Sequence, residues 1–185
     1  MNKTVTSKEE ILAVSRQIVA QQGLQAINMR TVAAQCGVAV GSIYNYFPSK
    51  NDLIIATIEA VWKEITQGVT ARSQNQGFLE NTAALFETIK TGGEKYPSFL
   101  SLHAISLADG GKDKGKQTMN EYFHTIQQDM LYWLQTDSRI QPEFFSENCT
   151  PEDFVAFIFS NIMMLLARQE PSCDLLIKII KKTLY

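Results

Sequence analysis

Residues 28–47 of the chain, NMRTVAAQCGVAVGSIYNYF, decide its fold. Two short runs with helically spaced apolar residues flank Gly37, and this pattern predicts two short helices joined by a tight turn. Glycine is favoured where a helix ends because it adopts a positive φ without steric cost. Ala33 is small enough to let the second helix cross close to the first. Helix–turn–helix units of this kind place their second helix in the major groove of DNA.

The charge of the chain is divided unequally between its two ends. The sequence has 17 Lys and Arg against 19 Asp and Glu, a net charge of -2. Residues 1–50 hold five basic and two acidic side chains, a net +3, which leaves -5 for residues 51–185. A basic end on an acidic protein indicates a nucleic-acid contact at that end.

Apolar residues recur at helical spacing along the whole chain, and no stretch alternates as a strand would, so we expect an all-α protein. Ser7 and Ser49 each precede an acidic residue by three positions, and Thr150 precedes a proline, three patterns that mark helix starts. A composition shift near residue 50 indicates a domain boundary, bridged by one of the predicted helices. The pattern predicts about nine helices, over residues 7–22, 28–36, 40–47, 49–70, 78–95, 97–108, 116–136, 151–168 and 173–184.

The sequence offers no sign of an enzyme, a metal site or a cofactor. Its three cysteines form no CxxC pair, and its two histidines have no HExxH partner. No apolar stretch is long enough to cross a membrane, and the start lacks the apolar core of a signal peptide. We therefore expect a cytoplasmic protein without a membrane contact.

The segment from Arg30 to Leu53, RTVAAQCGVAVGSIYNYFPSKNDL, follows a capped amphipathic helix that ends at Gly23. Together they resemble the signature of bacterial TetR-type transcriptional regulators, over about a quarter of the chain. The resemblance implies a helix–turn–helix DNA-binding domain at residues 1–47 and a helical ligand-binding and dimerisation domain at residues 48–185. It also implies that the residues in contact with double-stranded DNA are Asn28, Arg30, Thr31, Gly41, Ser42, Tyr44, Asn45, Tyr46 and Lys50.

The second helix of the motif has one face suited to burial. Ile43 and Phe47 lie four positions apart, so we expect them to face inward and to leave Tyr44 and Tyr46 partly outward. Lys50 stands at a predicted helix start, where the helix dipole favours an anion, and a DNA phosphate would offset this unfavourable placement.

The predicted helix 151–168 is apolar on every side and must be covered all round. One face can meet the chain's own core, and a second copy of the protein is the simplest cover for the other. The resemblance also implies a homodimer formed by the last two helices, and such a dimer presents two recognition helices to a near-palindromic operator. The candidate dimerisation residues are Phe154, Phe157, Ile158, Ile162, Leu165, Leu176, Ile179 and Ile180.

Large aromatic and Met side chains between the domain boundary and the last helices would suit a cavity for a flat, apolar small-molecule inducer. The same residues would equally suit an ordinary core. The candidate ligand-binding residues are Trp62, Phe86, Phe99, His103, Met119, Tyr122, Phe123, Ile126 and Met130.

Taken together, the sequence predicts a TetR-like homodimeric transcriptional repressor. A ligand in the body would shift the predicted helix 49–70 and so change the separation of the two recognition helices. The alternative is a helical small-molecule-binding protein or enzyme that has lost DNA binding.

Overall fold

The computed structural model describes residues 6–67, 76–97, 99–100 and 114–185. No strand occurs within these ranges, where the one bridge of β type joins Ser146 to Cys149. The expected all-α fold is thus confirmed. The described helices are α1 (Lys8–Gln22), α2 (Met29–Gln35), α3 (Val40–Tyr44), α4 (Lys50–Ile65), α6 (Phe78–Glu94), α8 (Lys114–Thr136), α9 (Pro151–Ala167) and α10 (Asp174–Leu184), with 3₁₀ turns at Leu24–Ala26 and Pro142–Phe144.

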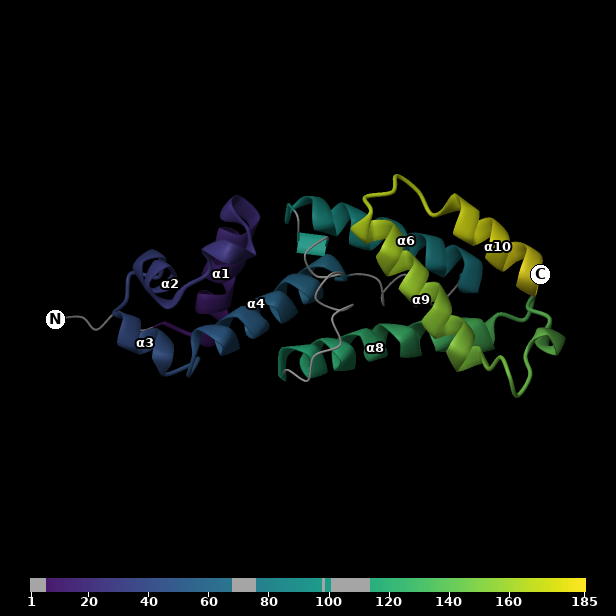
Figure 1. Cartoon of the computed structure of the whole chain (residues 1–185), viewed down its shortest axis with the longest axis horizontal. Coiled ribbons are helices and arrows are strands. Elements are labelled where there is room, and N and C mark those ends of the chain that lie inside the picture. Colours follow the sequence, from purple (N-terminus) through teal and green to yellow (C-terminus); the bar gives the residue numbers. More distant parts are fainter. Residues whose placement is uncertain (1–5, 68–75, 98, 101–113) are drawn as a thin grey trace.

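The helices form two groups along an elongated molecule (Figure 1). α1, α2 and α3 gather around the amino-terminal end, and we call residues 6–47 the head. α6, α8, α9 and α10 form the second group, which we call the body. α4 runs from the head into the body and contacts α1, α6 and α8, so it joins the two groups as a single rigid element.

One face of α4 is buried from end to end. Leu53 is buried at the head end, Val61 and Trp62 toward the body, and Thr57 lies between them with its hydroxyl donating to the Leu53 carbonyl at 2.7 Å. Leu53, Val61 and Trp62 belong to one hydrophobic cluster whose members range from Ile11 to Leu184. The head and the body therefore share a continuous core at α4.

The helix starts marked in the sequence are confirmed. Ser7 accepts the N–H of Glu10 at 3.1 Å, and the Glu10 carboxylate accepts the Ser7 N–H at 3.0 Å. Thr150 and Asp153 form the same reciprocal cap on α9, and Ser49 accepts the Asp52 N–H at the start of α4. Each cap satisfies backbone donors that have no partner inside the helix.

Two helices are shorter than predicted, and a third falls mostly outside the described residues. α3 ends at Tyr44 rather than at residue 47, because Pro48 disfavours a helical conformation at the residue before it. α4 ends at Ile65, and the rest of the predicted helix 49–70 lies partly outside the described residues. Of the predicted helix 97–108, only residues 99 and 100 are described as helical, so eight α-helices are seen in the described part.

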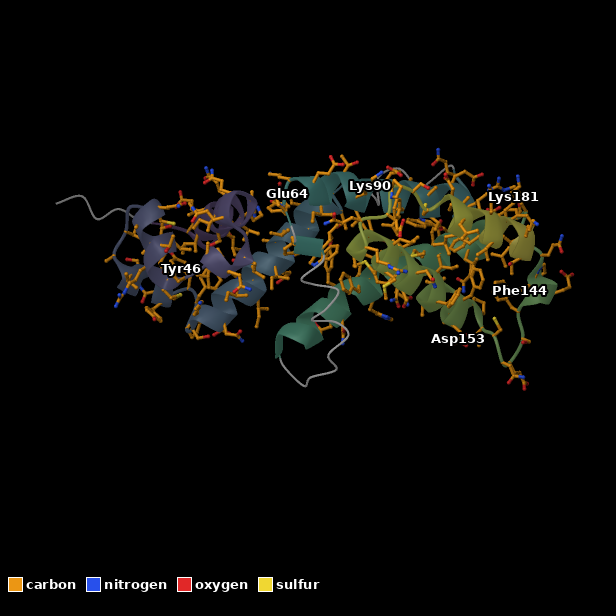
Figure 2. The ribbon with its side chains drawn as sticks, turned by 45° about the horizontal axis from the view of Figure 1, so that its top comes forward. Tyr46, Glu64, Lys90, Phe144, Asp153 and Lys181 are labelled. Carbon is orange, nitrogen blue, oxygen red and sulfur yellow. The ribbon has the colours of Figure 1, made fainter. Side chains whose placement is uncertain are left out.

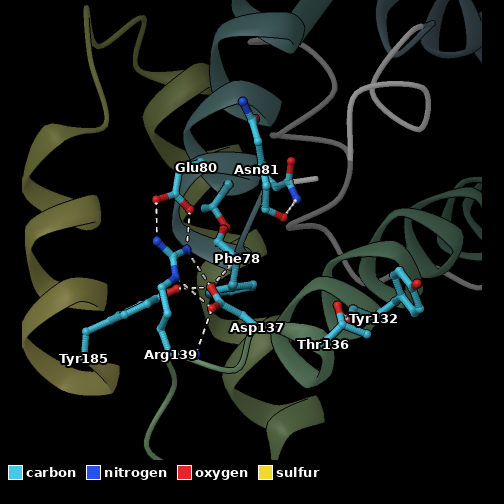
Figure 3. A network of polar contacts seen from close by, with 10 residues as sticks. Phe78, Glu80, Asn81, Tyr132, Thr136, Asp137, Arg139 and Tyr185 are labelled. Atoms are coloured by element: carbon cyan, nitrogen blue, oxygen red, sulfur yellow. Dashed lines mark hydrogen bonds and ion pairs between the residues drawn. The ribbon is translucent and has the colours of Figure 1, made fainter. Parts of the chain in front are cut away.

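A polar network fastens the far end of the body (Figure 3). The Asp137 carboxylate, whose side chain is only 3% exposed, accepts hydrogen bonds from the Phe78 N–H at 2.9 Å and the Tyr185 hydroxyl at 2.5 Å. Arg139 donates to Asp137 and also pairs with both oxygens of Glu80, at 3.0 and 2.7 Å. The hydrogen bonds from Arg139 and Tyr185 hold the pKa of Asp137 far below its usual range. The network thus ties α6, α8 and α10 together.

We expect Asp137→Asn to lower the free energy of unfolding by about 2 kcal/mol at pH 7, because buried donors lose a charged acceptor. Since the pKa of Asp137 is depressed in the folded protein, its stabilisation is present at neutral pH and declines as the pH falls below about 4. Urea unfolding of the parent and of Asp137→Asn, at pH 7 and below about pH 4, measures this effect. Asp129→Asn is the control, because burial raises the pKa of Asp129 and its charge adds no stability. Equal stability of Asp137→Asn and the parent at pH 7 would contradict the account.

Candidate nucleic-acid interface

The turn between α2 and α3 has the geometry that the sequence predicts. Gly37 has a φ of 67°. Its N–H donates to the Ala34 carbonyl at 3.2 Å, and the Val38 N–H donates to the Ala33 carbonyl at 3.0 Å. This pair of bonds is the Schellman ending of a helix, which requires a left-handed residue at the glycine position. Ala33 is buried, so the two helices approach closely at this point.

α3 turns one face into the head and the other to solvent. Ile43 and Phe47 are buried, as predicted, whereas Tyr44 is 50% exposed. Gly41 and Asn45 are also exposed, and Ser42 is half-buried. The outward face of α3 therefore carries small side chains at its start and polar side chains at its end. This arrangement suits close approach to base edges and phosphates.

Asn28 and Thr31 form a single unit at the start of α2. The Asn28 side-chain oxygen accepts the Thr31 N–H at 2.9 Å, and its amide group donates to the Thr31 hydroxyl oxygen at 2.6 Å. Asn28 thus caps α2. These bonds fix the Thr31 hydroxyl at the amino-terminal end of α2, where the helix dipole favours an anion.

The basic residues of the head are not equivalent. Arg30 and Lys50 are exposed. Lys8 lies 6.0 Å from the centroid of the Phe47 ring, and Arg16 pairs with Glu64 at 2.8 Å. Arg30 on α2 and Lys50, the first residue of α4, are therefore exposed cations free of these contacts and suited to meet phosphates.

Tyr46 has a contact that the sequence does not reveal. Its hydroxyl donates to the Thr6 carbonyl at 2.6 Å, across 40 positions of sequence. The ring is partly exposed, at the end of the head away from the body (Figure 2). A phosphate contact by Tyr46 stays a prediction, and in this structure the hydroxyl proton is engaged within the chain.

The described members of the predicted ligand-binding set come together, but as a packed core. The Trp62 ring lies 5.7 Å from that of Phe99 and 5.0 Å from that of Phe123, centroid to centroid. The Tyr122 hydroxyl bonds the Thr66 hydroxyl and the Trp62 carbonyl. Phe86, Ile126 and Met130 are buried, whereas His103 and the side chain of Met119 lie outside the described residues.

Two hollows lie in the described body. One, of about 330 Å³, lies between the ends of α6 and α9 and is lined by Tyr96, Leu100 and Leu166 among others. The other, of about 420 Å³, follows the seam between α4 and α6 beside Glu64 and Gly92. Neither hollow is lined by a predicted ligand-binding residue, so a binding role for that set stays a prediction.

Most of the predicted dimerisation residues lie against the chain's own core, and their role in dimerisation stays a prediction. Five of them are buried there: Phe154, Ile158, Ile162, Leu176 and Ile180. Leu165 is half-buried against the same core. A helix that is apolar all round does not reveal from its sequence which face its own core covers.

The outward apolar side chains on α9 and α10 are Phe157, Met164, Leu175 and Ile179, exposed by 58, 58, 73 and 47%. We call these four residues the outer apolar face. Phe157 and Ile179 belong to the predicted set, whereas Met164 and Leu175 were missed. The seven-residue spacing of Phe157 and Met164 was the available signal, since it places both on one side of a helix. α9 and α10 both pack on α6 (Figure 1).

Two further features bear on function within the described ranges. No group of three or more His, Cys, Asp or Glu side chains is placed there to hold a metal ion. No helix there combines the length and apolar character needed to cross a membrane.

Residues 11–57 match the family model of the bacterial regulatory proteins of the tetR family. Solved TetR-family regulators share the fold of the chain over nearly its full length. The FadR transcriptional regulator from Bacillus subtilis, solved in complex with stearoyl-CoA, has a TM-score of 0.66, 18% identity and coverage of 95% of this chain and 96% of its own. At that identity the likeness concerns the fold alone.

Similarity in sequence to curated relatives concerns part of the chain. The nucleoid occlusion factor SlmA from Glaesserella parasuis is 27% identical over 92 residues, which are 48% of this chain and 46% of SlmA. The HTH-type transcriptional repressor KstR from Mycolicibacterium smegmatis is 36% identical over 58 residues, which are 31% of this chain and 28% of KstR. The matched stretches thus span less than half the length of these relatives.

Gly37 and Gly41 provide a matched pair for testing the motif, because a Cβ at either position would meet no atom within 4 Å. We expect Gly37→Ala to destabilise the protein by about 1 kcal/mol, since its φ of 67° strains any L-residue. Gly41→Ala should stabilise α3 by about 0.5–1 kcal/mol through helix propensity. If α3 lies against a duplex, Gly41→Ala should nevertheless bind DNA more weakly. Thermal melting and duplex titration measure both effects, and unimpaired duplex binding by Gly41→Ala would argue against contact at this face.

Proposed function

We propose that this chain, a TetR-family transcriptional regulator with a helix–turn–helix DNA-binding domain, acts as a homodimeric repressor. In this proposal residues 1–47 bind DNA and residues 48–185 bind a ligand and dimerise. A small, largely apolar ligand releases the protein from a palindromic operator. The observation that carries the proposal is the exposed face of α3, with exposed cations on either side of it in sequence.

The proposed DNA contacts follow from this arrangement. Gly41, Tyr44 and Asn45 are exposed on one side of the recognition helix or directly after it. Arg30 on α2 and Lys50 at the start of α4 supply exposed positive charge. Cations of this kind position a protein on the phosphate backbone, while the groups on α3 read base edges.

The proposed homodimer is supported by the outer apolar face. Four large apolar side chains on two helices that pack on α6 are rarely left in water, because their burial is favourable by about 25 cal/mol per Å². A second copy that presents the same face forms a two-fold interface of four helices. The two heads of such a dimer can meet two half-sites related by the same symmetry.

The proposed ligand and the direction of control rest on the body and on the relatives. Trp62, Phe99 and Phe123 form an aromatic cluster where α4 packs into the body, and an apolar ligand that separated their rings would displace α4. FadR is a regulator solved with stearoyl-CoA, and KstR is a repressor, which favours repression relieved by an apolar ligand. Because a regulator of this kind acts on chromosomal DNA, we propose that the protein is located in the cytoplasm.

The competing function is a helical small-molecule-binding protein whose head no longer binds DNA. Fluorescence anisotropy with DNA from immediately upstream of the coding region separates the two functions. The proposed repressor binds this duplex tightly against scrambled competitor, with a steep salt dependence. Equal, weak binding to both duplexes would favour the competing function.

We expect Lys50→Ala to weaken binding to every duplex and to flatten the slope of log K against log salt by about 0.9 per head. Asn45→Ala should instead change which duplex is preferred. Anisotropy titrations over a salt series measure both responses. Lys63→Ala is a control for Lys50→Ala, because Lys63 lies toward the body end of α4 and pairs with Glu59 at 2.7 Å. An unchanged salt slope in Lys50→Ala would exclude this lysine as a phosphate contact.

We expect Phe157→Glu combined with Ile179→Glu to convert the dimer to a monomer, because two charges per chain would be buried in the interface. Sedimentation equilibrium measures the change in mass. Tyr132→Glu is the matched control, since Tyr132 is 60% exposed on α8, outside the outer apolar face. If the double variant stays dimeric, or if Tyr132→Glu dissociates as well, another surface forms the interface.

A further inference from the structure

Glu64 connects three helical elements at the junction of head and body (Figure 2). It lies in the last turn of α4. One carboxylate oxygen pairs with Nε of Arg16 on α1 at 2.8 Å. The other carboxylate oxygen accepts a hydrogen bond from the Lys95 ammonium group, directly after α6. The chain of charges therefore runs from the head, through α4, to the body.

Glu64 is ionised at neutral pH. Partial burial would raise its pKa, but the hydrogen bond from Lys95 and the charges of Lys95 and Arg16 outweigh this effect and hold the pKa below its ordinary value. The Arg16 and Glu64 side chains are each about one-third exposed, so each single pair is worth little to global stability. An ion pair that adds little to global stability can still fix the relative orientation of the two helices that it joins.

The buried Ile65 of α4 packs closely against Gly92 of α6 at this point. A Cβ on Gly92 would lie 3.0 Å from the Ile65 backbone, so the two helices touch there through their main chains. Directly beside this contact lies the hollow of about 420 Å³, lined by Glu64, Gln67 and Thr88 among others. This close contact fixes the spacing of α4 and α6, and the ion pairs of Glu64 add directional restraint at the edge of the seam.

We propose that Glu64 is a positioning residue that sets the angle of the DNA-binding head relative to the body through Arg16 and Lys95. This inference rests on the proposed function, because in a homodimer the head angle determines the separation of the two recognition helices. A movement of α4 against α6 breaks the pairing and frees the head to adopt other angles.

The first test does not depend on DNA. Spin labels are placed on the head at Gln35→Cys and on the body at Gln128→Cys, both exposed positions, in a chain whose three native cysteines are replaced by Ala. Labelled chains are mixed with excess unlabelled chains, so that the measured distance lies within one chain. Glu64→Gln should broaden the distribution of head-to-body distances, and Arg16→Gln should broaden it to the same extent.

Glu59→Gln is the matched control. It removes the same charge from the same helix, but its partner Lys63 lies four positions along α4, so no link between head and body is lost. The proposal expects the parent distribution for Glu59→Gln. Superimposable distributions for Glu64→Gln, Arg16→Gln and the parent would overturn it. If Glu64→Gln fails to fold, the distribution of head-to-body distances in Arg16→Gln alone decides whether the proposal holds.

The second test uses the operator found with the upstream duplex, in a series with altered spacing between half-sites. The parent should prefer one spacing, and Glu64→Gln should reduce this preference by about twofold to fivefold, the factor expected for a partly exposed ion pair. Glu59→Gln should keep the parent's preference. An unchanged preference in Glu64→Gln overturns the proposal, whereas a parent that binds no duplex refutes the proposed function and leaves the distance measurement to judge Glu64.

Discussion

The structure depends on the burial of one face of α4 in the core that the head and the body share. Its amino-terminal half packs with the head around Leu53, and its carboxyl-terminal half packs with the body around Trp62. Because a helix is stiff over its 16 residues, a displacement at Trp62 is carried to Leu53 without any flexible segment between them. This shared helix provides a physical route by which a change in the body can reach the DNA-binding surface.

Charge is arranged along the same axis. Arg30 and Lys50 lie exposed on the head, while Arg16, in the middle of α1, is held by Glu64 at the junction. The cations at this end of the molecule are therefore divided between exposed positions and an inner contact with Glu64. The net negative charge of residues 51–185 disfavours approach of a nucleic acid to the body, which directs a duplex toward the head.

Local patterns were predictable from the sequence, whereas long-range ones were not. The caps at Ser7, Ser49 and Thr150, and the left-handed turn at Gly37, depend on neighbouring residues and were predicted correctly. Two of the four residues of the outer apolar face, Met164 and Leu175, were not predicted. The sequence of a helix that is apolar all round does not identify which side faces the core. The bonds from Tyr46 to Thr6 and from Arg16 to Glu64 span 40 or more positions and require the folded arrangement. The aromatic residues of the body satisfied the criteria for a core and for a cavity equally well.

The central claim is that two heads, held by one dimer, recognise two half-sites on DNA. A nuclease-protection footprint on the DNA upstream of the coding region tests this claim most directly. The account predicts two protected half-sites of inverted sequence, with centres about 10 base pairs or a multiple of one helical turn apart. Protection of a single half-site, or of no site at protein concentrations that saturate non-specific binding, would contradict it.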